Sequence, residues 1–272
     1  MFGIGWFSTG RGKGSRDLLS TVQDQIKSGE IDALITFVFC NREAGESPET
    51  DKFFDLVKSY HLPLVCFSSK KFCAARQKPI EACRLEYDRE VMKLLAPFYQ
   101  DISVLAGYML IVGPEMCRKH NMINLHPASP GGPKGTWQEV VWKLMETRAS
   151  ESGVMMHLVT PELDRGPVVT YCSYPIRGKK FDAAWQEVDR LGVEAIKSGQ
   201  GANNALFRLI REEGLSREFP LITATVKAFS EGKVKVKNGQ VVDSRGVALP
   251  GYDLTAEIEK ELQQLRDQAR TL

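Results

Sequence analysis

The chain has 272 residues, of which 43% are hydrophobic and 26% are charged, and 36 basic against 34 acidic side chains leave a net charge of +2. This composition suits a globular core and excludes disorder, and the near balance of charge argues against a dedicated nucleic-acid-binding protein. No apolar run approaches the roughly 20 residues that span a bilayer, so we expect a cytoplasmic protein without a membrane partner. The six cysteines form no C-x-x-C pair, and we interpret them as reduced, buried thiols.

Short apolar runs alternate with longer amphipathic segments through the first half of the chain. The predicted strands are residues 2–7, 33–40, 63–67, 102–109 and 122–125. The predicted helices are residues 17–27, 49–60, 82–98, 114–118 and 137–148. Strands that are apolar on both faces and separated by helices indicate buried parallel strands in βαβ units.

The second half of the chain shows other patterns. Residues 153–159 and 168–176 are joined by a polar turn, which predicts a hairpin or a sheet edge. Residues 181–213 have a helical pattern that glycines at 199–201 divide into two helices. Asn238-Gly239 between alternating residues predicts a second hairpin, and residues 255–270 a tail helix. The predicted fold is α/β, a Rossmann-like, mostly parallel twisted sheet flanked by helices, with a C-terminal hairpin and helical extension.

A glycine-rich segment follows the first predicted strand and opens the first helix. It contains Gly12, Lys13, Gly14, Ser15 and Arg16. Backbone N–H groups and the helix dipole at such a turn favour an anion, and glycines allow it to approach closely. The segment matches neither the Walker A loop nor the dinucleotide-binding G-x-G-x-x-G pattern. An anion site and an ordinary strand–helix turn therefore both stay open from these residues alone.

Two further segments can carry chemistry. Asn124 and His126 stand two residues apart at the end of an apolar strand, on the same side of it, and Asp164 lies in Leu-Asp-Arg-Gly-Pro. Together they could polarise a carbonyl, stabilise an oxyanion and move a proton, although each also has a plain structural interpretation. We interpret His61, His120 and His157 as structural, and no metal-ligand spacing occurs, so we expect no metal.

Three segments carry a resemblance to a known family. They are residues 104–109, residues 122–127 with Asn-Leu-His-Pro, and residues 157–168 with Leu-Asp-Arg-Gly-Pro. Together they resemble the folate-dependent formyltransferase family, and most of all its members in purine synthesis. The resemblance extends to residues 231–236 and 249–252 near the C-terminus.

The resemblance implies a role for each matching position. Asn124, His126 and Asp164 match the catalytic residues of the family, and residues 12–16 match its substrate phosphate loop. A third set matches its formyl-folate site: Arg84, Met109, Leu110, Ile111, Val112, Asn124 and Thr160. The implied division is a catalytic core at 1–180, a helical insertion at 181–213, and at 214–272 a helix, hairpin and tail helix of the same domain.

The sequence also departs from the family at four places. Residues 128–137 replace the usual Ser-Leu-Leu-Pro after His-Pro, and residues 180–210 read as an insertion. Arg16 stands where an asparagine is usual, and Glu213 and Glu218 are out of register with the ribose-binding glutamate of the family. The first of these departures bears on the identity of the acceptor.

The implied reaction is formyl transfer from the co-substrate 10-formyltetrahydrofolate to the amine of 5-phosphoribosylglycinamide. Asn124 and protonated His126 would stabilise the oxyanion, and Asp164 would keep His126 charged and relay the proton. Four alternatives stay open: another amine acceptor such as an amino sugar nucleotide, a formyl-folate hydrolase, a formyltransferase acting on methionyl-tRNA, which we rank low, and a non-catalytic nucleotide-binding module. We expect only small-molecule partners, and the sequence leaves a homodimer open.

Overall fold

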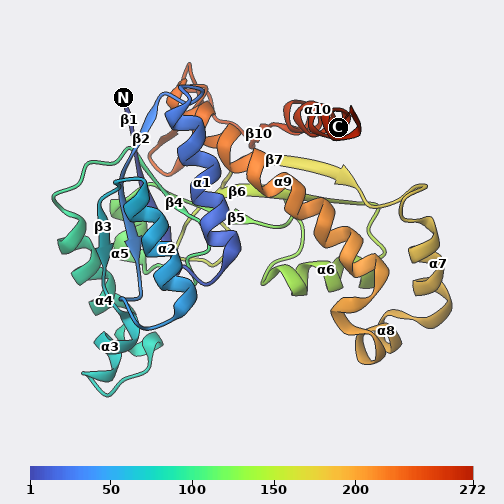
Figure 1. Cartoon of the computed structure of the whole chain (residues 1–272), viewed down its shortest axis with the longest axis horizontal. Coiled ribbons are helices and arrows are strands. Elements are labelled where there is room, and N and C mark those ends of the chain that lie inside the picture. Colours follow the sequence, from blue (N-terminus) through green and yellow to red (C-terminus); the bar gives the residue numbers. More distant parts are fainter. Residues whose placement is uncertain (272) are drawn as a thin grey trace.

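The computed structural model describes residues 1–271, and its central feature is one eight-stranded sheet (Figure 1). From one edge to the other the strands are β10 (Tyr252–Asp253), β7 (Val168–Pro175), β6 (Glu151–Leu158), β5 (Met122–His126), β4 (Ile102–Leu105), β1 (Phe2–Ser8), β2 (Ala33–Cys40) and β3 (Leu64–Cys66). Strands β3, β2, β1, β4 and β5 pair in parallel, and β6 joins β5 and β7 in antiparallel register. The predicted α/β fold is therefore confirmed.

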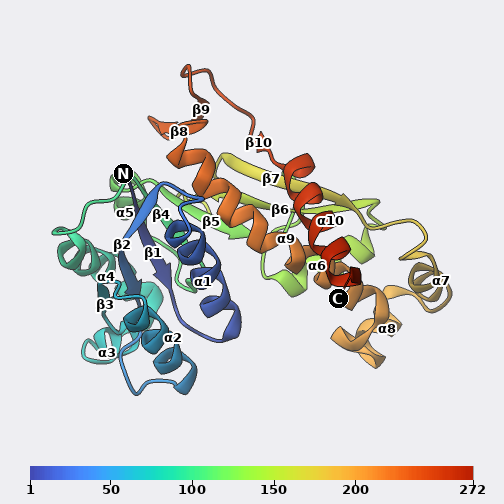
Figure 2. The ribbon, with the colours of Figure 1, turned by 45° about the horizontal axis from the view of Figure 1, so that its top comes forward.

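Helices cover both faces of the sheet. They are α1 (Lys13–Lys27), α2 (Pro48–Ser59), α3 (Ser69–Ala74), α4 (Ile80–Leu95), α5 (Pro114–Lys119), α6 (Trp137–Glu146), α7 (Asp182–Leu191), α8 (Val193–Gly199), α9 (Ala205–Ser230) and α10 (Thr255–Thr271). Helices α1, α2 and α9 lie on one face, and α3, α4 and α5 on the other (Figure 2).

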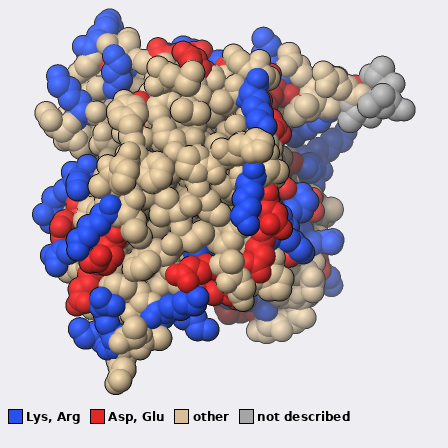
Figure 3. Space-filling model, turned by 60° about the vertical axis from the view of Figure 1, so that its left-hand side comes forward, with Lys and Arg blue, Asp and Glu red and all other residues tan. Residues whose placement is uncertain are grey.

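The alternation of side chains along β1 explains the two layers. Ile4 and Trp6 are buried against α1 and α9, whereas Phe7 packs with Phe37 and Phe39 against α4. Because both faces are covered, the inner strands contain few polar residues, which is why their sequences read as continuous apolar runs. Figure 3 shows one outer face, whose middle is largely uncharged and whose margins carry both signs of charge.

A second core lies at the end of the sheet that carries β7. It buries residues of α6, α7, α8 and the first part of α9, among them Trp185 and Phe207. The predicted insertion at 181–213 is thus helical, but it differs from the expectation in its limits. Glycines in the left-handed region interrupt it at Gly192 and again at Gly201, so it holds three helical pieces before α9.

Helix α9 runs for 26 residues through the point where we expected a boundary, between 213 and 214. Gly214 does not end the helix, because it serves packing: a Cβ on it would lie 3.0 Å from the Tyr174 hydroxyl. The predicted strand at 102–109 was too long, since β4 ends at Leu105 and Gly107 turns the chain with a φ of 71°. Helix α3 and strand β10 were not predicted. The hairpin of β8 (Val234–Lys237) and β9 (Gln240–Asp243) forms as expected around Asn238-Gly239.

Candidate active site

The carboxyl ends of β1 and β4 are joined by hydrogen bonds between the loops that follow them. The Thr9 hydroxyl accepts from the Met109 N–H at 2.9 Å, and the Thr9 N–H donates to the Gly107 carbonyl at 3.0 Å. Gly107 lies so near α1 that a Cβ would be 3.0 Å from the Ser15 hydroxyl. The glycine-rich segment after β1 and the segment after β4 therefore form one continuous surface, as expected at the carboxyl edge of a parallel sheet.

We call residues 9–16 the β1 loop. Gly12 precedes α1, and a Cβ on Gly12 or Gly14 would meet no atom of the protein within 4 Å. Packing within the chain does not require glycine at either position, whereas a ligand lying against the backbone would. Two of the three cations of the loop already have partners: Lys13 bonds Asp17 at 2.6 Å, and Arg16 bonds Glu49 at 2.7 Å, whereas Arg11 is the third.

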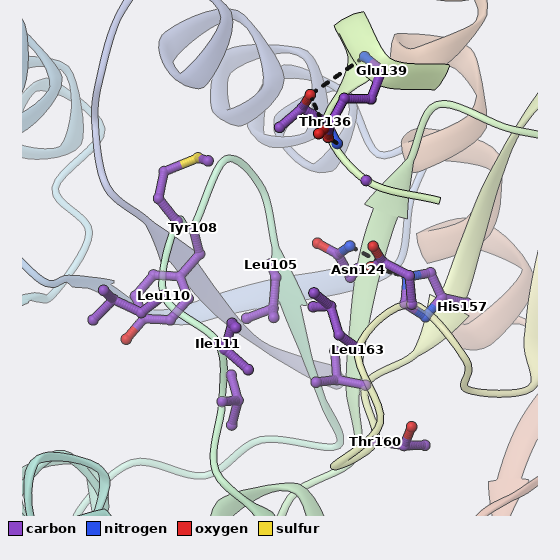
Figure 4. A pocket seen from close by; sticks show the side chains of 15 residues that line it. Leu105, Tyr108, Leu110, Ile111, Asn124, Thr136, Glu139, His157, Thr160 and Leu163 are labelled. Carbon is purple, nitrogen blue, oxygen red and sulfur yellow. Dashed lines mark hydrogen bonds and ion pairs between the residues drawn. The ribbon is translucent and has the colours of Figure 1, made fainter. Parts of the chain in front are cut away.

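A cavity of about 360 Å³ opens between the segment after β4 and the loop after β6 (Figure 4). Apolar side chains, including Leu105, Ile111 and Leu163, form most of its lining, and polar groups gather at one end. It is lined by Met109, Leu110, Ile111, Val112, Asn124, Thr160 and Asp164 among the predicted residues. Most of the residues predicted from the sequence thus line one cavity. An apolar cleft with a few convergent polar groups is the usual form of a small-molecule site.

Helix α4 holds the wall formed by residues 109–113 in place. The buried Asp88 carboxylate accepts from the Gly113 N–H at 2.6 Å, and burial raises the pKa of Asp88 to about 6. Gly113 is required there because a Cβ would lie 2.7 Å from that carboxylate. Arg84 lies on the other side of the same segment, where it lines a separate cavity of about 150 Å³ with Met109, Leu110 and Ile111.

Three polar side chains meet at the inner end of the larger cavity. The Asn124 Nδ2 is 3.3 Å from the His157 Nε2, and the same nitrogen of His157 is 3.6 Å from the Asp164 carboxylate. Figure 4 shows the Asn124 amide turned toward the His157 ring. The His157 Nδ1 donates to the Leu158 carbonyl at 2.9 Å. In protonated His157 the Nε2–H points to the Asp164 carboxylate, whereas in neutral His157 the Nε2 accepts from the Asn124 amide. That assignment leaves the second N–H of the amide for a substrate.

His126 is placed differently from the expectation. Its side chain is buried, and its Nε2–H donates to the Pro133 carbonyl at 3.0 Å. Burial lowers the pKa of His126, and the carboxylate of Asp164 only partly opposes this effect. The direct imidazole contact of Asp164 is His157 rather than His126. The structure therefore favours a neutral His126 that donates from Nε2, in place of the imidazolium we expected.

We call residues 159–167 the β6 loop, and its backbone is specified by the Leu-Asp-Arg-Gly-Pro motif. Asp164 has a φ of 51°, in the left-handed region that aspartate tolerates better than most residues. A Cβ on Gly166 would lie 1.7 Å from the Leu158 carbonyl oxygen, so only glycine fits. The contact with His157 and the hydrogen bond from the Gly135 N–H keep the pKa of Asp164 below its usual value, although burial opposes them.

Residues 128–137, the departure noted in the sequence, contact both predicted acid–base residues. The Pro133 carbonyl accepts from His126, and the Gly135 N–H favours the ionised Asp164. Sequence reasoning missed these contacts and also the place of His157. The signal for His157 was available only through strand pairing, because β6 sets His157 directly opposite Asn124 of β5.

Comparison with known families identifies the chain. The model of the formyl transferase family matches residues 12–184, well over half of the chain. The chain belongs to the formyl transferase family. The match includes most of the β1 loop, the residues that line the cavity and the whole β6 loop. The predicted membership is therefore confirmed.

Individual relatives are similar over most of their length. The chain is 25% identical over 239 residues to the phosphoribosylglycinamide formyltransferase of Haemophilus influenzae, which covers 86% of this chain and 92% of that protein. It is 29% identical over 168 residues to the Dictyostelium discoideum protein of the same name, covering 58% of this chain and 78% of that one.

Solved structures share the fold. The phosphoribosylglycinamide formyltransferase of Coxiella burnetii superposes with a TM-score of 0.65 at 18% identity, over 93% of this chain and 98% of that one. A formyltetrahydrofolate deformylase from Pseudomonas syringae superposes with a TM-score of 0.60 at 19% identity, over 89% of this chain and 65% of that one. In this formyl transferase, no helix within residues 1–271 has the length and apolar character needed to cross a membrane.

Proposed function

We propose that this formyl transferase moves a formyl group from 10-formyltetrahydrofolate to the amine of 5-phosphoribosylglycinamide. The observation that carries the proposal is the meeting of Asn124, His157 and Asp164 at the end of an apolar cavity whose other wall is residues 109–112. The curated relatives named above, similar over most of their length, support this acceptor.

The cavity supplies two kinds of contact for the donor, which the reaction consumes as a substrate. Its apolar walls suit the flat ring system of a folate, and the backbone groups of residues 109–112 can hydrogen-bond to ring nitrogens and amides. Arg84, across the same segment, stays a predicted donor contact. Closure of the cavity around the ring would exclude water from the formyl carbon.

The acceptor amine, in its neutral form, attacks the formyl carbon. A new C–N bond forms as the carbonyl π electrons move to oxygen, and the second N–H of the Asn124 amide donates to that oxygen. His126 supplies a further N–H once the Pro133 carbonyl gives way. Donors of this kind typically contribute about 3 kcal/mol each to stabilisation of the transition state.

Asp164 completes the reaction by moving the proton. It takes a proton from the attacking nitrogen, directly or through water, and returns it to the folate nitrogen as the C–N bond to the donor breaks. Its low pKa keeps it ionised near neutral pH, ready to accept that proton. The Nε2 of His157 faces both Asn124 and Asp164, and when protonated it can donate to the Asp164 carboxylate.

The β1 loop is the proposed site of the acceptor phosphate. The free space at Gly12 and Gly14 and the start of α1 suit an anion, with N–H groups of the first helical turn as donors. Glu213 and Glu218 do not supply the ribose contact, since Glu213 bonds Arg217 at 2.6 Å and Glu218 is paired with Arg211 at 2.5 Å.

An assay of tetrahydrofolate release tests the proposal. The purified chain is incubated with 10-formyltetrahydrofolate alone, with 5-phosphoribosylglycinamide, and with an amino sugar nucleotide. We expect release only with 5-phosphoribosylglycinamide, together with formylated product in equal amount. Release without an amine would indicate a hydrolase, and release with the sugar nucleotide alone would replace the acceptor.

A further inference from the structure

A second cavity, of about 710 Å³, lies beside the donor cavity and shares four residues with it, including Asp164 and Leu163. Residues 132–135 and α6 form one side, and the end of the β6 loop forms the other. We call it the outer groove. Because Asp164 lines both cavities, a molecule reacting at Asp164 can extend from one into the other.

The outer groove carries three basic side chains, Lys134, Lys143 and Arg165. Lys134 and Arg165 have no carboxylate within 4 Å among residues 1–268, whereas Lys143 lies 3.3 Å from Glu146. This differs from the β1 loop, where Lys13 and Arg16 are both paired within the chain. Two cations held without partners at the edge of a cavity attract an anionic group.

The carboxylates of the groove leave this attraction in place. Glu139 is turned back to the start of its own helix, where its Oε2 accepts from the Thr136 N–H at 2.7 Å and the Thr136 hydroxyl at 2.8 Å. Gly135 makes this possible, because a Cβ there would lie 2.5 Å from the same oxygen. The negative charge of Asp164 is directed toward His157 at the inner end of the groove.

Lys134 and Arg165 are also placed next to the reaction centre along the chain. Lys134 stands between Pro133, which bonds His126, and Gly135, whose N–H favours the charge on Asp164. Arg165 directly follows Asp164. An anion bridging the two side chains would join the two loops that position His126 and Asp164, so its binding would be coupled to the geometry of the site.

We propose that the outer groove binds an anionic group of a substrate whose reacting end lies at Asp164, with Lys134 and Arg165 as its main ligands and Lys143 as a third. This inference rests on the proposed function, and it adds a specificity site to it. The carboxylates of the glutamate tail of the donor have the required chemistry and remain unassigned, because the β1 loop is the proposed site of the acceptor phosphate. Binding of that phosphate in the groove is the alternative outcome that the test distinguishes.

The experiment uses the double variant Lys134→Gln/Arg165→Gln and the matched control Lys235→Gln/Lys237→Gln, which removes two exposed lysines of β8. Initial rates are measured with donor carrying one or three glutamates, and with 5-phosphoribosylglycinamide or its dephosphorylated form. We expect the groove variant to raise one KM by roughly ten-fold, as for loss of two charge-assisted contacts, with kcat within two-fold. The control variant should change neither.

The pattern across substrates identifies the anion. If the groove holds the glutamate tail, the variant loses the advantage of the triglutamyl donor, and if it holds the phosphate, it loses the advantage of the phosphorylated acceptor. The proposal is overturned if both KM values stay within two-fold of those of the control variant. Titration of tetrahydrofolate mono- and triglutamate and of ribose 5-phosphate, read by calorimetry, tests the groove even if the acceptor named above is wrong.

Discussion

The β1 loop and the β6 loop lie near the same edge of the sheet, but they are specified in different ways. In the β1 loop the glycines at 12 and 14 face open space, and two of the three cations, Lys13 and Arg16, are paired within the chain. In the β6 loop Gly166 is forced by the Leu158 carbonyl, and the left-handed Asp164 is held by His157. The first loop is shaped to leave room, and the second is shaped to hold one side chain in place.

The difference has a consequence for how each loop responds to substitution. Changes in the β6 loop should alter both stability and turnover, because its residues contact the chain from several sides. Changes in the β1 loop should leave the fold intact and alter only the binding of a substrate. The predictions below separate these two behaviours.

The largest effect is expected from Asp164→Asn. Asparagine tolerates the left-handed conformation but cannot accept the proton, so kcat should fall by roughly 10³-fold, within the usual range for a general acid–base group. The measurement is the initial rate of tetrahydrofolate release, with thermal unfolding as the check on the fold. A variant with kcat within ten-fold of the wild type would remove Asp164 from the chemistry.

Gly166→Ala should destabilise the protein by about 2 kcal/mol and also reduce turnover, because the added methyl group overlaps the Leu158 carbonyl and forces the backbone to move. Gly14→Ala is the matched control, since its methyl group meets no atom of the protein within 4 Å. Urea unfolding of the two variants measures the contrast. Equal stabilities would show that the β6 loop is not constrained as the structure indicates.

His157→Gln should lower kcat by roughly ten-fold and leave the KM for the donor nearly unchanged, because it disturbs oriented donors rather than the apolar walls. Glutamine can still accept a hydrogen bond from the Asn124 amide, but it cannot become a cation beside the Asp164 carboxylate. Steady-state kinetics measure the split between kcat and KM, and His61→Gln, at the end of α2, is the control. An increase confined to the KM for the donor would instead make His157 part of the donor-binding wall.

Gly14→Ala tests the β1 loop on its own. We expect the KM for the acceptor to rise by about five-fold or more, since a methyl group would occupy the space where an anion approaches the backbone. Stability should be unchanged or higher by up to about 1 kcal/mol, because alanine favours a helix more than glycine. An unchanged KM for the acceptor would move the phosphate away from this loop, and the outer groove would then be its alternative site.

Much of the fold was predictable because the inner strands are apolar on both faces and several turns contain residues typical of turns, such as asparagine and glycine. The limits of β2 match the prediction, and Asn238-Gly239 forms the expected hairpin. Helix α9 continues through the limit expected at 213, and its Gly214 lies in close contact with the Tyr174 hydroxyl. The local sequence pattern does not indicate which distant side chain packs against a glycine.

The sequence predicted which residues belong to the candidate site better than it predicted which of their side chains contact one another. The cavity gathers Asn124 and residues 109–112 because the parallel strands β4 and β5 end at one edge of the sheet, whereas Asp164 arrives on the loop that follows the antiparallel β6. The pairing of β5 with β6 decides that Asp164 contacts His157, and no feature near His157 in the sequence indicates this. The burial of His126 under Pro133 depends in the same way on a loop whose path is set by tertiary contacts.

The smallest effect is expected in acid, and it tests the protonation of His126, the last residue of β5, against a substitution in the β1 loop. Burial lowers the pKa of His126 from 6.5, so as the pH falls the unfolded chain takes up this proton before the folded chain does. Stability contributed by His126 is therefore present above pH 6.5 and is lost as the pH falls from there through the folded pKa. Urea unfolding between pH 7.5 and 5.5 measures the slope.

His126→Gln should reduce that slope, because glutamine can donate to the Pro133 carbonyl without titrating. His120, whose pKa burial also lowers, adds to the slope, and Asp88, whose pKa burial raises to about 6, opposes it. Both are unchanged in the variant, so the difference between wild type and variant isolates His126. Arg16→Gln in the β1 loop should keep the full slope, since it removes no titrating group in this range. A His126→Gln slope equal to that of the wild type would mean that His126 keeps its proton as readily in the fold as in water, and the imidazolium first expected would then replace the neutral donor.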